Sequence, residues 1–254
     1  MGLFSKKTKT VTVSSEITKS RILNKDSDFF VQEIYKTLRT NIMFALPHTD
    51  ENPAGKVIVF SSAIPGEGKT TVCINTAITI AQTGAKVLLI DADLRIPKFH
   101  KYFGINGKKG LSDVLGGFCK LNEAVVAIKE HGMDCIPAGQ IPPNPAELLA
   151  SQTTVSLLEE LKGIYDYILI DTPPITVVTD ALAISPASSG MVLIVREGKT
   201  THTVLKNALK SLEFANIKVL GIINNSVIIS ETSYGGPLSK YNYSKTYRYD
   251  YKKQ

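Results

Sequence analysis

The chain has 254 residues, of which 43% are apolar, and it carries a formal net charge of +6 at pH 7. This apolar content excludes a mainly disordered protein. The three cysteines show no CxxC spacing of a zinc site, we expect no signal peptide, and no apolar run reaches the roughly 18–20 residues of a membrane span.

The positive charge is concentrated near the two ends. Residues 1–25 hold six lysines and arginines against one glutamate, and residues 237–254 hold five against one aspartate. Charge placed in this way favours solubility, a membrane surface or an acidic partner, and we expect no nucleic-acid partner. The patterns divide the chain into a basic lead-in (1–25), a folded domain (26–228) and a flexible tyrosine-rich tail (229–254).

The first predicted helix covers about residues 28–44, because apolar side chains recur there at fourfold spacing. Asp26 or Ser27 is expected to cap its N-terminus. Three charged residues lie along the other side at threefold spacing, and periodicity alone interprets them as a solvated face with weak ion pairs. They are Glu33, Lys36 and Arg39.

A phosphate-binding loop is predicted in the stretch 57–71. The β-branched run 57–60 indicates a buried strand, and a helix is expected from the loop to about Thr83. Small residues let backbone N–H groups close around phosphate oxygens, and the helix N-terminus adds the positive end of its dipole. Ala63 replaces the glycine that opens the general pattern, but the strand and helix on either side support the assignment. The expected nucleotide-binding residues are Pro65, Gly66, Glu67, Gly68, Lys69, Thr70 and Thr71.

Apolar strands alternate with helical patterns through the rest of the chain. Such alternation predicts a mostly parallel sheet with helices on both faces. The expected strands are 86–90, 134–137, 167–170, 191–195 and 219–223. The expected helices are 110–115, 122–129, one from about Ala146, 154–162 and 203–215.

Three carboxylates directly follow two of these strands. Asp91 and Asp93 come after the strand 86–90, and Asp171 comes after the strand 167–170. Ligands bind at the carboxyl ends of parallel strands, so we expect the three side chains to meet near Lys69 and Thr70. Carboxylates beside a phosphate loop predict a Mg²⁺–nucleotide centre.

The segments 65–70, 89–95 and 168–174 resemble the three nucleotide motifs of bacterial tyrosine kinases, in their stand-alone cytoplasmic form beside capsule and exopolysaccharide export systems. The likeness extends through most of the chain from Glu33 onward. It implies a P-loop NTPase-like fold, ATP and Mg²⁺ as cofactors, and Asn224 as an adenine contact. It also implies a ring-shaped homo-oligomer built by the motif Glu-x-x-Arg-x-x-Arg, in which Lys36 here takes the middle place. A transmembrane adaptor protein is expected to activate the chain and recruit it to the inner face of the membrane.

The resemblance and the chemistry of phosphoryl transfer together give an expected role to each site residue. Lys69 neutralises the terminal phosphates, while Thr70 and Asp171 hold Mg²⁺ with help from Asp93. Asp91 is the candidate that accepts the tyrosine proton, although the sequence alone does not decide how the roles divide between Asp91 and Asp93. Lys69 is interpreted as an exposed loop lysine, so its replacement should abolish transfer and leave the fold largely intact.

Two other functions compete with the kinase. Related ATPases that partition plasmids or position the division site carry a second lysine five residues before the main one, where this chain has Ile64. The other competitor is a nucleotide-binding scaffold without catalysis, which the intact set of loop and carboxylate residues argues against.

Six of the ten tyrosines lie in the last 21 residues, among lysines and small polar residues. An edge strand is one interpretation, since three of them alternate along the chain. We favour a substrate tail that is phosphorylated by a neighbouring subunit, because few apolar side chains are there to be buried. The expected acceptors are Tyr241, Tyr243, Tyr247, Tyr249 and Tyr251.

Overall fold

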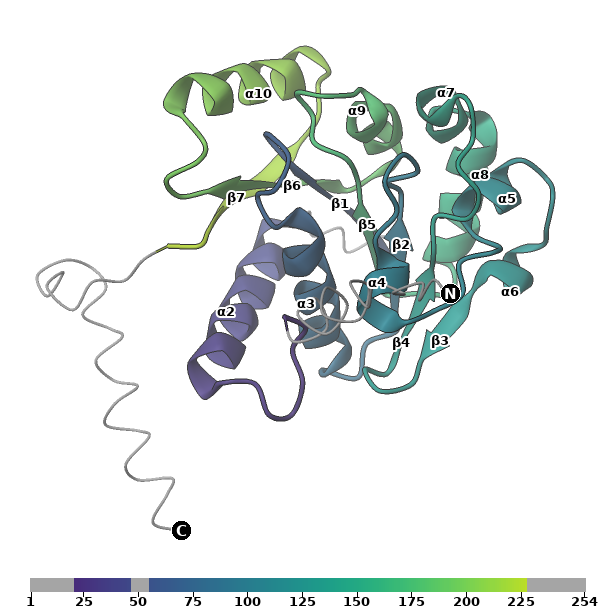
Figure 1. Ribbon diagram of the computed structural model, residues 1–254, viewed down its shortest axis with the longest axis horizontal. Coiled ribbons are helices and arrows are strands. Elements are labelled where there is room, and N and C mark those ends of the chain that lie inside the picture. Colours follow the sequence, from purple (N-terminus) through teal and green to yellow (C-terminus); the bar gives the residue numbers. More distant parts are fainter. Residues whose placement is uncertain (1–20, 47–54, 228–254) are drawn as a thin grey trace, which may run out of the picture.

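The computed structural model describes residues 21–46 and 55–227, and within them one seven-stranded sheet lies between two layers of helices (Figure 1). The strands are β1 (Lys56–Ser62), β2 (Val87–Asp91), β3 (Val126–Ile128), β4 (Met133–Ile136), β5 (Tyr167–Asp171), β6 (Gly190–Arg196) and β7 (Val219–Asn225). The helices are α2 (Phe29–Ala45), α3 (Lys69–Ala81), α4 (Phe99–Phe103), α5 (Leu111–Leu115), α6 (Leu121–Ala124), α7 (Pro145–Leu149), α8 (Gln152–Lys162), α9 (Asp180–Ile184), the 3-10 turn η1 (Ser185–Ala187) and α10 (His202–Phe214).

The sheet has the order β3-β4-β2-β5-β1-β6-β7, and every pair in it is parallel except β3 with β4. Phe60 on β1 and Asp91 on β2 both stand opposite Asp171 on β5. The carboxyl ends of the three central strands therefore lie at one edge, and the predicted parallel fold is confirmed.

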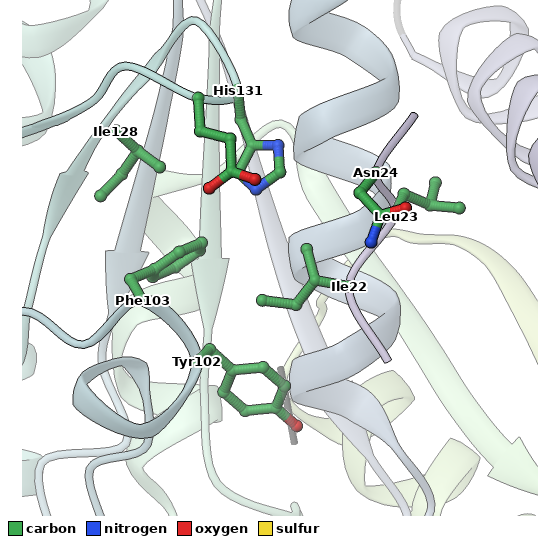
Figure 2. A pocket seen from close by; sticks show the side chains of 8 residues that line it. Ile22, Leu23, Asn24, Tyr102, Phe103, Ile128 and His131 are labelled. Atoms are coloured by element: carbon green, nitrogen blue, oxygen red, sulfur yellow. The ribbon is translucent and has the colours of Figure 1, made fainter. Parts of the chain in front are cut away.

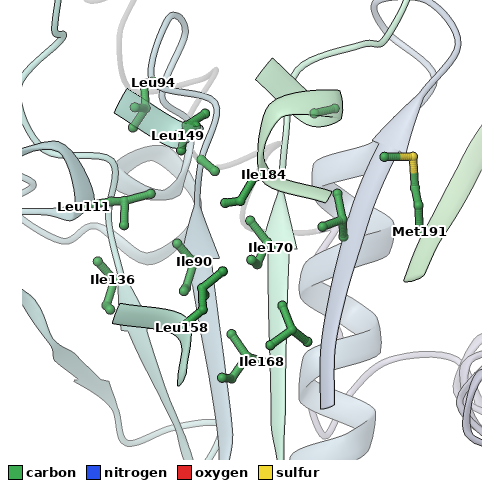
Figure 3. Close-up of a cluster of buried hydrophobic side chains, with 14 of the residues drawn as sticks. Ile90, Leu94, Leu111, Ile136, Leu149, Leu158, Ile168, Ile170, Ile184 and Met191 are labelled. Atoms are coloured by element: carbon green, nitrogen blue, oxygen red, sulfur yellow. The ribbon is translucent and has the colours of Figure 1, made fainter. Parts of the chain in front are cut away.

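A separate apolar core fills the space on each face of the sheet. In β2, Leu88 and Ile90 pack into the core under α5 and α7–α10, whereas Val87 and Leu89 pack into the core under α2, α3 and α4. This alternation follows from the twofold period of a strand. Figure 3 shows the first core, where Ile90, Ile168 and Ile170 meet side chains of the covering helices.

Three local predictions were wrong or incomplete. The stretch 122–129 was predicted as one helix, but α6 ends at Ala124 and residues 126–128 pair with β4 as an antiparallel hairpin. Pairing with an available edge outweighed the weak helical pattern. The N-cap of α2 is Asp28, whose carboxylate accepts the N–H of Phe30, and neither Asp26 nor Ser27. The short helices α4 and α9 were not predicted.

None of the described helices is both long and apolar enough to cross a membrane. The division of the chain at residues 25 and 228 stays a prediction.

Candidate active site

A cavity of about 620 Å³ opens at the carboxyl edge of the sheet. Its floor is the loop between β1 and α3. One end is formed by residues at the carboxyl ends of β6 and β7, and the other by residues that follow β2 and β5. The lining residues are Arg21, Pro65, Gly66, Gly68, Lys69, Thr70, Thr71, Asp93, Arg95, Ile96, Lys98, Tyr102, Pro173, Pro174, Val177, Val178, Arg196, Asn225 and Ser226.

Two glycines give the loop its shape. Gly66 and Gly68 have φ angles of +80° and +89°, a left-handed conformation that favours glycine. A Cβ on Gly68 would also collide with the side-chain amide of Asn225. Gly68 is the N-cap of α3, so the helix begins at the cavity floor with its first backbone N–H groups unpaired within the helix. A helix N-terminus with this loop geometry is suited to bind phosphate.

The loop is held from outside by the end of β6 and the segment that follows it. The buried Glu67 carboxylate accepts the N–H of Ile64 at 2.8 Å and the hydroxyl of Thr200. Arg196 donates to the carbonyl of Gly66 and Lys199 to the carbonyl of Pro65. The Glu67 side chain therefore positions the loop, and only its backbone is available to a nucleotide.

Lys69, Thr70, Asp93 and Asp171 form one buried cluster. Lys69 Nζ lies 3.1 Å from Asp93 Oδ2 and 3.3 Å from Asp171 Oδ2, and Thr70 Oγ1 donates to Asp171 Oδ2 at 2.7 Å. Burial alone would lower the pKa of Lys69, but the two carboxylates outweigh it and the pKa is raised. The expectation that Lys69 is an exposed loop lysine is wrong, because only 4% of the surface of Lys69 is exposed.

Asp91 lies behind this cluster and does not line the cavity. Its carboxylate is fully buried and accepts the backbone N–H groups of Asp93, Lys98 and Phe99 at 3.0–3.2 Å. Burial raises the pKa of Asp91 to about 7, with the nearby Asp171 adding to the shift. Of the three carboxylates predicted to meet near Lys69 and Thr70, Asp93 and Asp171 contact Lys69, whereas Asp91 binds backbone N–H groups instead because β2 ends there and the chain turns.

The cluster offers oxygen donors that fit Mg²⁺. A hydroxyl from Thr70 and carboxylates from Asp171 and Asp93 are hard ligands, and Mg²⁺ is usually bound by one or two carboxylates together with substrate phosphates. Among the residues that the structure describes, no group of three or more His, Cys, Asp or Glu side chains forms a closed metal cage. The donor set thus suits a Mg²⁺ ion that arrives with a nucleotide.

The predicted adenine contact, Asn224, does not line the cavity, whereas the next residue does. Asn225 lines the cavity and donates its amide to the carbonyl of Glu67 at 2.8 Å, whereas Asn224 is exposed and does not line it. Successive residues of a strand point to opposite sides, so the two asparagines of β7 cannot share a role.

The predicted oligomerisation residues all lie on α2. Glu33 pairs with Lys36 at 2.7 Å within the helix, and Arg39 donates to the backbone carbonyl of Thr79 on α3 at 2.8 Å. Arg39 thus has a role inside its own chain. The five expected acceptor tyrosines, 241 to 251, lie outside the described residues.

Several lining residues were missed by the sequence reasoning. Arg196 and Lys98 bring positive charge to the cavity, as does Arg21 from the segment before α2. Arg196 ends β6 and Lys98 follows β2, so their place at the carboxyl edge could have revealed them. Arg21 is brought there by tertiary contact, because Asn75 of α3 binds the backbone of residues 21 and 23.

A second cavity of about 360 Å³ lies beside α4 (Figure 2). Ile22, Phe103 and Ile128 give it apolar walls, and His131 and Asn24 lie at its edge. Tyr102 lines both cavities, and its hydroxyl lies 2.8 Å from Thr71 Oγ1 on α3.

Residues 55–202 match the family of AAA domains, AAA_31. The chain is 41% identical over 201 residues to tyrosine-protein kinase YwqD of Bacillus subtilis (strain 168). This match covers 79% of this chain and 83% of that protein. Its structure is similar to the kinase domain of Escherichia coli tyrosine kinase ETK, with a TM-score of 0.73 and 35% identity. The match covers 81% of this chain and 80% of the kinase domain. A lesser likeness links it to the septum site-determining protein MinD complexed with Mg-ADP from Pyrococcus horikoshii, with a TM-score of 0.59, 27% identity and coverage of 70% and 72%. The chain therefore belongs to the bacterial tyrosine kinases, as its nucleotide motifs predicted.

Proposed function

We propose that this chain transfers the γ-phosphoryl group of ATP to tyrosine hydroxyls, including those of its own C-terminal segment, and so regulates capsule or exopolysaccharide synthesis and export. The observation that carries this proposal is the cluster in which Lys69, Thr70 and Asp93 line the phosphate-loop cavity and the buried Asp171 contacts Lys69 and Thr70 from behind. Phosphoryl transfer asks a protein mainly for positioning and charge neutralisation, and this cluster offers both.

The loop and its lysine bind the triphosphate in this proposal. Backbone N–H groups of residues 66–68 bind phosphate oxygens, and Lys69 exchanges its carboxylate partners for the β- and γ-phosphates. Thr70 and Asp171 would hold Mg²⁺, with Asp93 assisting through water. When bound, Mg²⁺ neutralises the charge of the β- and γ-phosphate oxygens. Asn225 is the adenine-side contact that the cavity favours.

Asp93 is the better candidate for the group that accepts the tyrosine proton. A general base must come within hydrogen-bond reach of the proton that it removes, and Asp93 lines the cavity while Asp91 is enclosed by three backbone N–H donors. We assign Asp91 to the support of the turn 93–99.

The proposal includes partners. A homo-oligomer, in which Glu33, Lys36 and Arg39 take part, would bring the tail of one subunit to the site of the next. Lysine lacks the guanidinium fork of the arginine in the family motif, so contacts of Lys36 should be less specific. A transmembrane adaptor would hold the kinase at the inner face of the membrane and raise its activity.

The test is a phosphotransfer assay on the purified chain with labelled ATP, with and without the cytoplasmic segment of the transmembrane adaptor. Label on tyrosine supports the kinase, and stimulation by that segment supports the adaptor. Release of phosphate to water without tyrosine labelling would favour a partitioning-type ATPase, and binding of ATP without either reaction would favour a scaffold.

A further inference from the structure

The end of the active-site cavity beside β2 and β5 differs in chemistry from the phosphate loop. Two apolar side chains are exposed there, Ile96 at 66% and Val177 at 59%. Pro173 and Pro174 line the same end. Large apolar side chains that remain exposed inside a functional cavity mark a place where an apolar group of a ligand is covered.

Both walls of this apolar end are fixed to the fold. Arg95, next to Ile96, forms a two-pronged ion pair with Asp180, with both N–O distances at 2.9 Å and the Asp180 side chain fully buried. The opposite wall is tied to the carboxyl end of β1. Ser61 donates to the carbonyl of Pro173 at 2.8 Å, and the N–H of Ile175 donates to the carbonyl of Ser62 at 3.0 Å. The Arg95–Asp180 pair also joins the loop after β2 to α9, which begins three residues beyond Val177. The cavity end is therefore preformed.

This end also adjoins the reacting groups. The backbone N–H of Ile96 donates to Asp93 Oδ1 at 3.2 Å, while Asp93 Oδ2 faces Lys69. A flat apolar group that lies against Ile96 would thus have its far edge beside the Asp93 carboxylate. At the opposite end, Asn225, Ser226 and Arg196 offer polar groups instead.

We propose that Ile96 and Val177 form the binding slot for the phenol ring of the acceptor tyrosine, with the Arg95–Asp180 pair setting the position of the Ile96 wall. The proposal rests on the proposed kinase function. The tyrosine oxygen attacks the γ-phosphorus, the bond from the γ-phosphorus to the β–γ bridging oxygen breaks, ADP leaves, and the phenolic proton passes to Asp93. Serine and threonine carry their hydroxyl too close to the backbone to reach past the slot, so the slot selects tyrosine.

The test uses the full chain and three peptides that copy residues 237–254, with tyrosines kept, replaced by phenylalanine or replaced by serine. All three keep the same lysines and arginine, so only the ring and its hydroxyl differ. The phenylalanine peptide should inhibit labelling of the tyrosine peptide competitively, and the serine peptide should not. Equal inhibition by the two would show that charge alone binds the peptide and would overturn the slot.

Ile96→Ala and Val177→Ala should each raise the KM for the tyrosine peptide about tenfold, since each removes methyl groups from the ring contact. Ile96→Leu should restore a KM near that of the wild type. Ile141→Ala is the matched control, because Ile141 is 65% exposed but does not line the cavity. Affinity for an ATP analogue should stay within about twofold in every variant.

The outcomes separate the slot from the kinase function. If the wild type labels tyrosine and Ile96→Ala leaves the peptide KM unchanged, the slot is wrong and the kinase stands. If the wild type labels no tyrosine with its adaptor segment present, the kinase function is wrong and the slot falls with it. A raised KM accompanied by an equal loss of analogue affinity would place Ile96 in nucleotide binding and also overturn the slot.

Discussion

Replacing Lys69 with methionine removes a cation that lies between two carboxylates. The side chains of Lys69, Asp93 and Asp171 are 5%, 4% and 0% exposed, and the lysine reaches both carboxylates within 3.3 Å. Methionine keeps most of the volume but none of the charge. Asp171 then keeps the Thr70 hydroxyl as a donor, while the attraction of Lys69 is lost. The substitution should therefore abolish transfer and also destabilise the fold in the absence of nucleotide.

The size of the destabilisation follows from the burial. Removing one partner from a buried ion pair costs about 3–5 kcal/mol. A domain of this size loses about 2–4 °C of melting temperature for each kcal/mol, so we expect the melting temperature of Lys69→Met to fall by about 6–20 °C. This fall in the melting temperature should be smaller at pH 5 than at pH 8. Without the lysine, burial holds the pKa of Asp171 above its unfolded value, so the folded variant binds a proton that the unfolded chain has released and is stabilised as the pH falls.

Thermal unfolding by circular dichroism measures this difference, with transfer to tyrosine measured on the same samples. Lys109→Met is the control, because the side chains of Lys109 and its partner Glu123 are 51% and 43% exposed and such surface pairs contribute little to stability. If Lys69→Met melts within about 2 °C of the control at pH 8, the buried cluster does not stabilise the chain as argued. Transfer near the wild-type rate would reject Lys69 as the phosphate lysine.

Three further predictions concern Asp91, the tail and α2. Between pH 6 and pH 8 the folded Asp91 carboxyl, with a pKa of about 7, loses its proton, while the unfolded carboxyl is already charged. Asp91 should therefore reduce the free energy of unfolding by about 1.4 kcal/mol over this range. Asp91→Asn should remove this pH dependence in urea titrations, and an unchanged dependence would contradict the raised pKa. A Lys69→Met chain with an intact tail should be labelled by an active chain truncated before Tyr234, and no label in a co-assembled mixture would exclude transfer between subunits. Labelled protein should also lose oligomeric mass in light scattering, since each phosphate adds about −1.5 to −2 charges. Arg39→Ala should cost about 1 kcal/mol even in dilute monomer, because it frees a carbonyl in the last turn of α3, and an unchanged melting temperature would show that the contact is not formed.

Local sequence patterns determined the parallel sheet and the parts of the site that lie directly on its elements. Continuous apolar runs indicated β1, β2, β5 and β6, since a strand buried on both faces needs apolar residues at every position. The phosphate loop was predicted from glycine, lysine and threonine at fixed spacing, a local property of the chain. The turn in which β2 ends is also local, yet the sequence did not indicate which of Asp91 and Asp93 would face the ligand.

Tertiary packing decided the rest of the site. Asp91 is enclosed because the backbone of residues 93–99 folds back over its carboxylate. Lys69 is buried because Asp93, just after β2, and Asp171, at the end of β5, lie against it. The choice of Asn225 over Asn224 depends on the register of β7 against β6, and Arg21 reaches the cavity because Asn75 binds its segment. Each of these contacts joins residues distant in the chain or sets a backbone direction, and neither composition nor periodicity encodes such information. The sequence by itself determined which chemical groups the site contains, whereas only the three-dimensional fold decided which of them face the ligand.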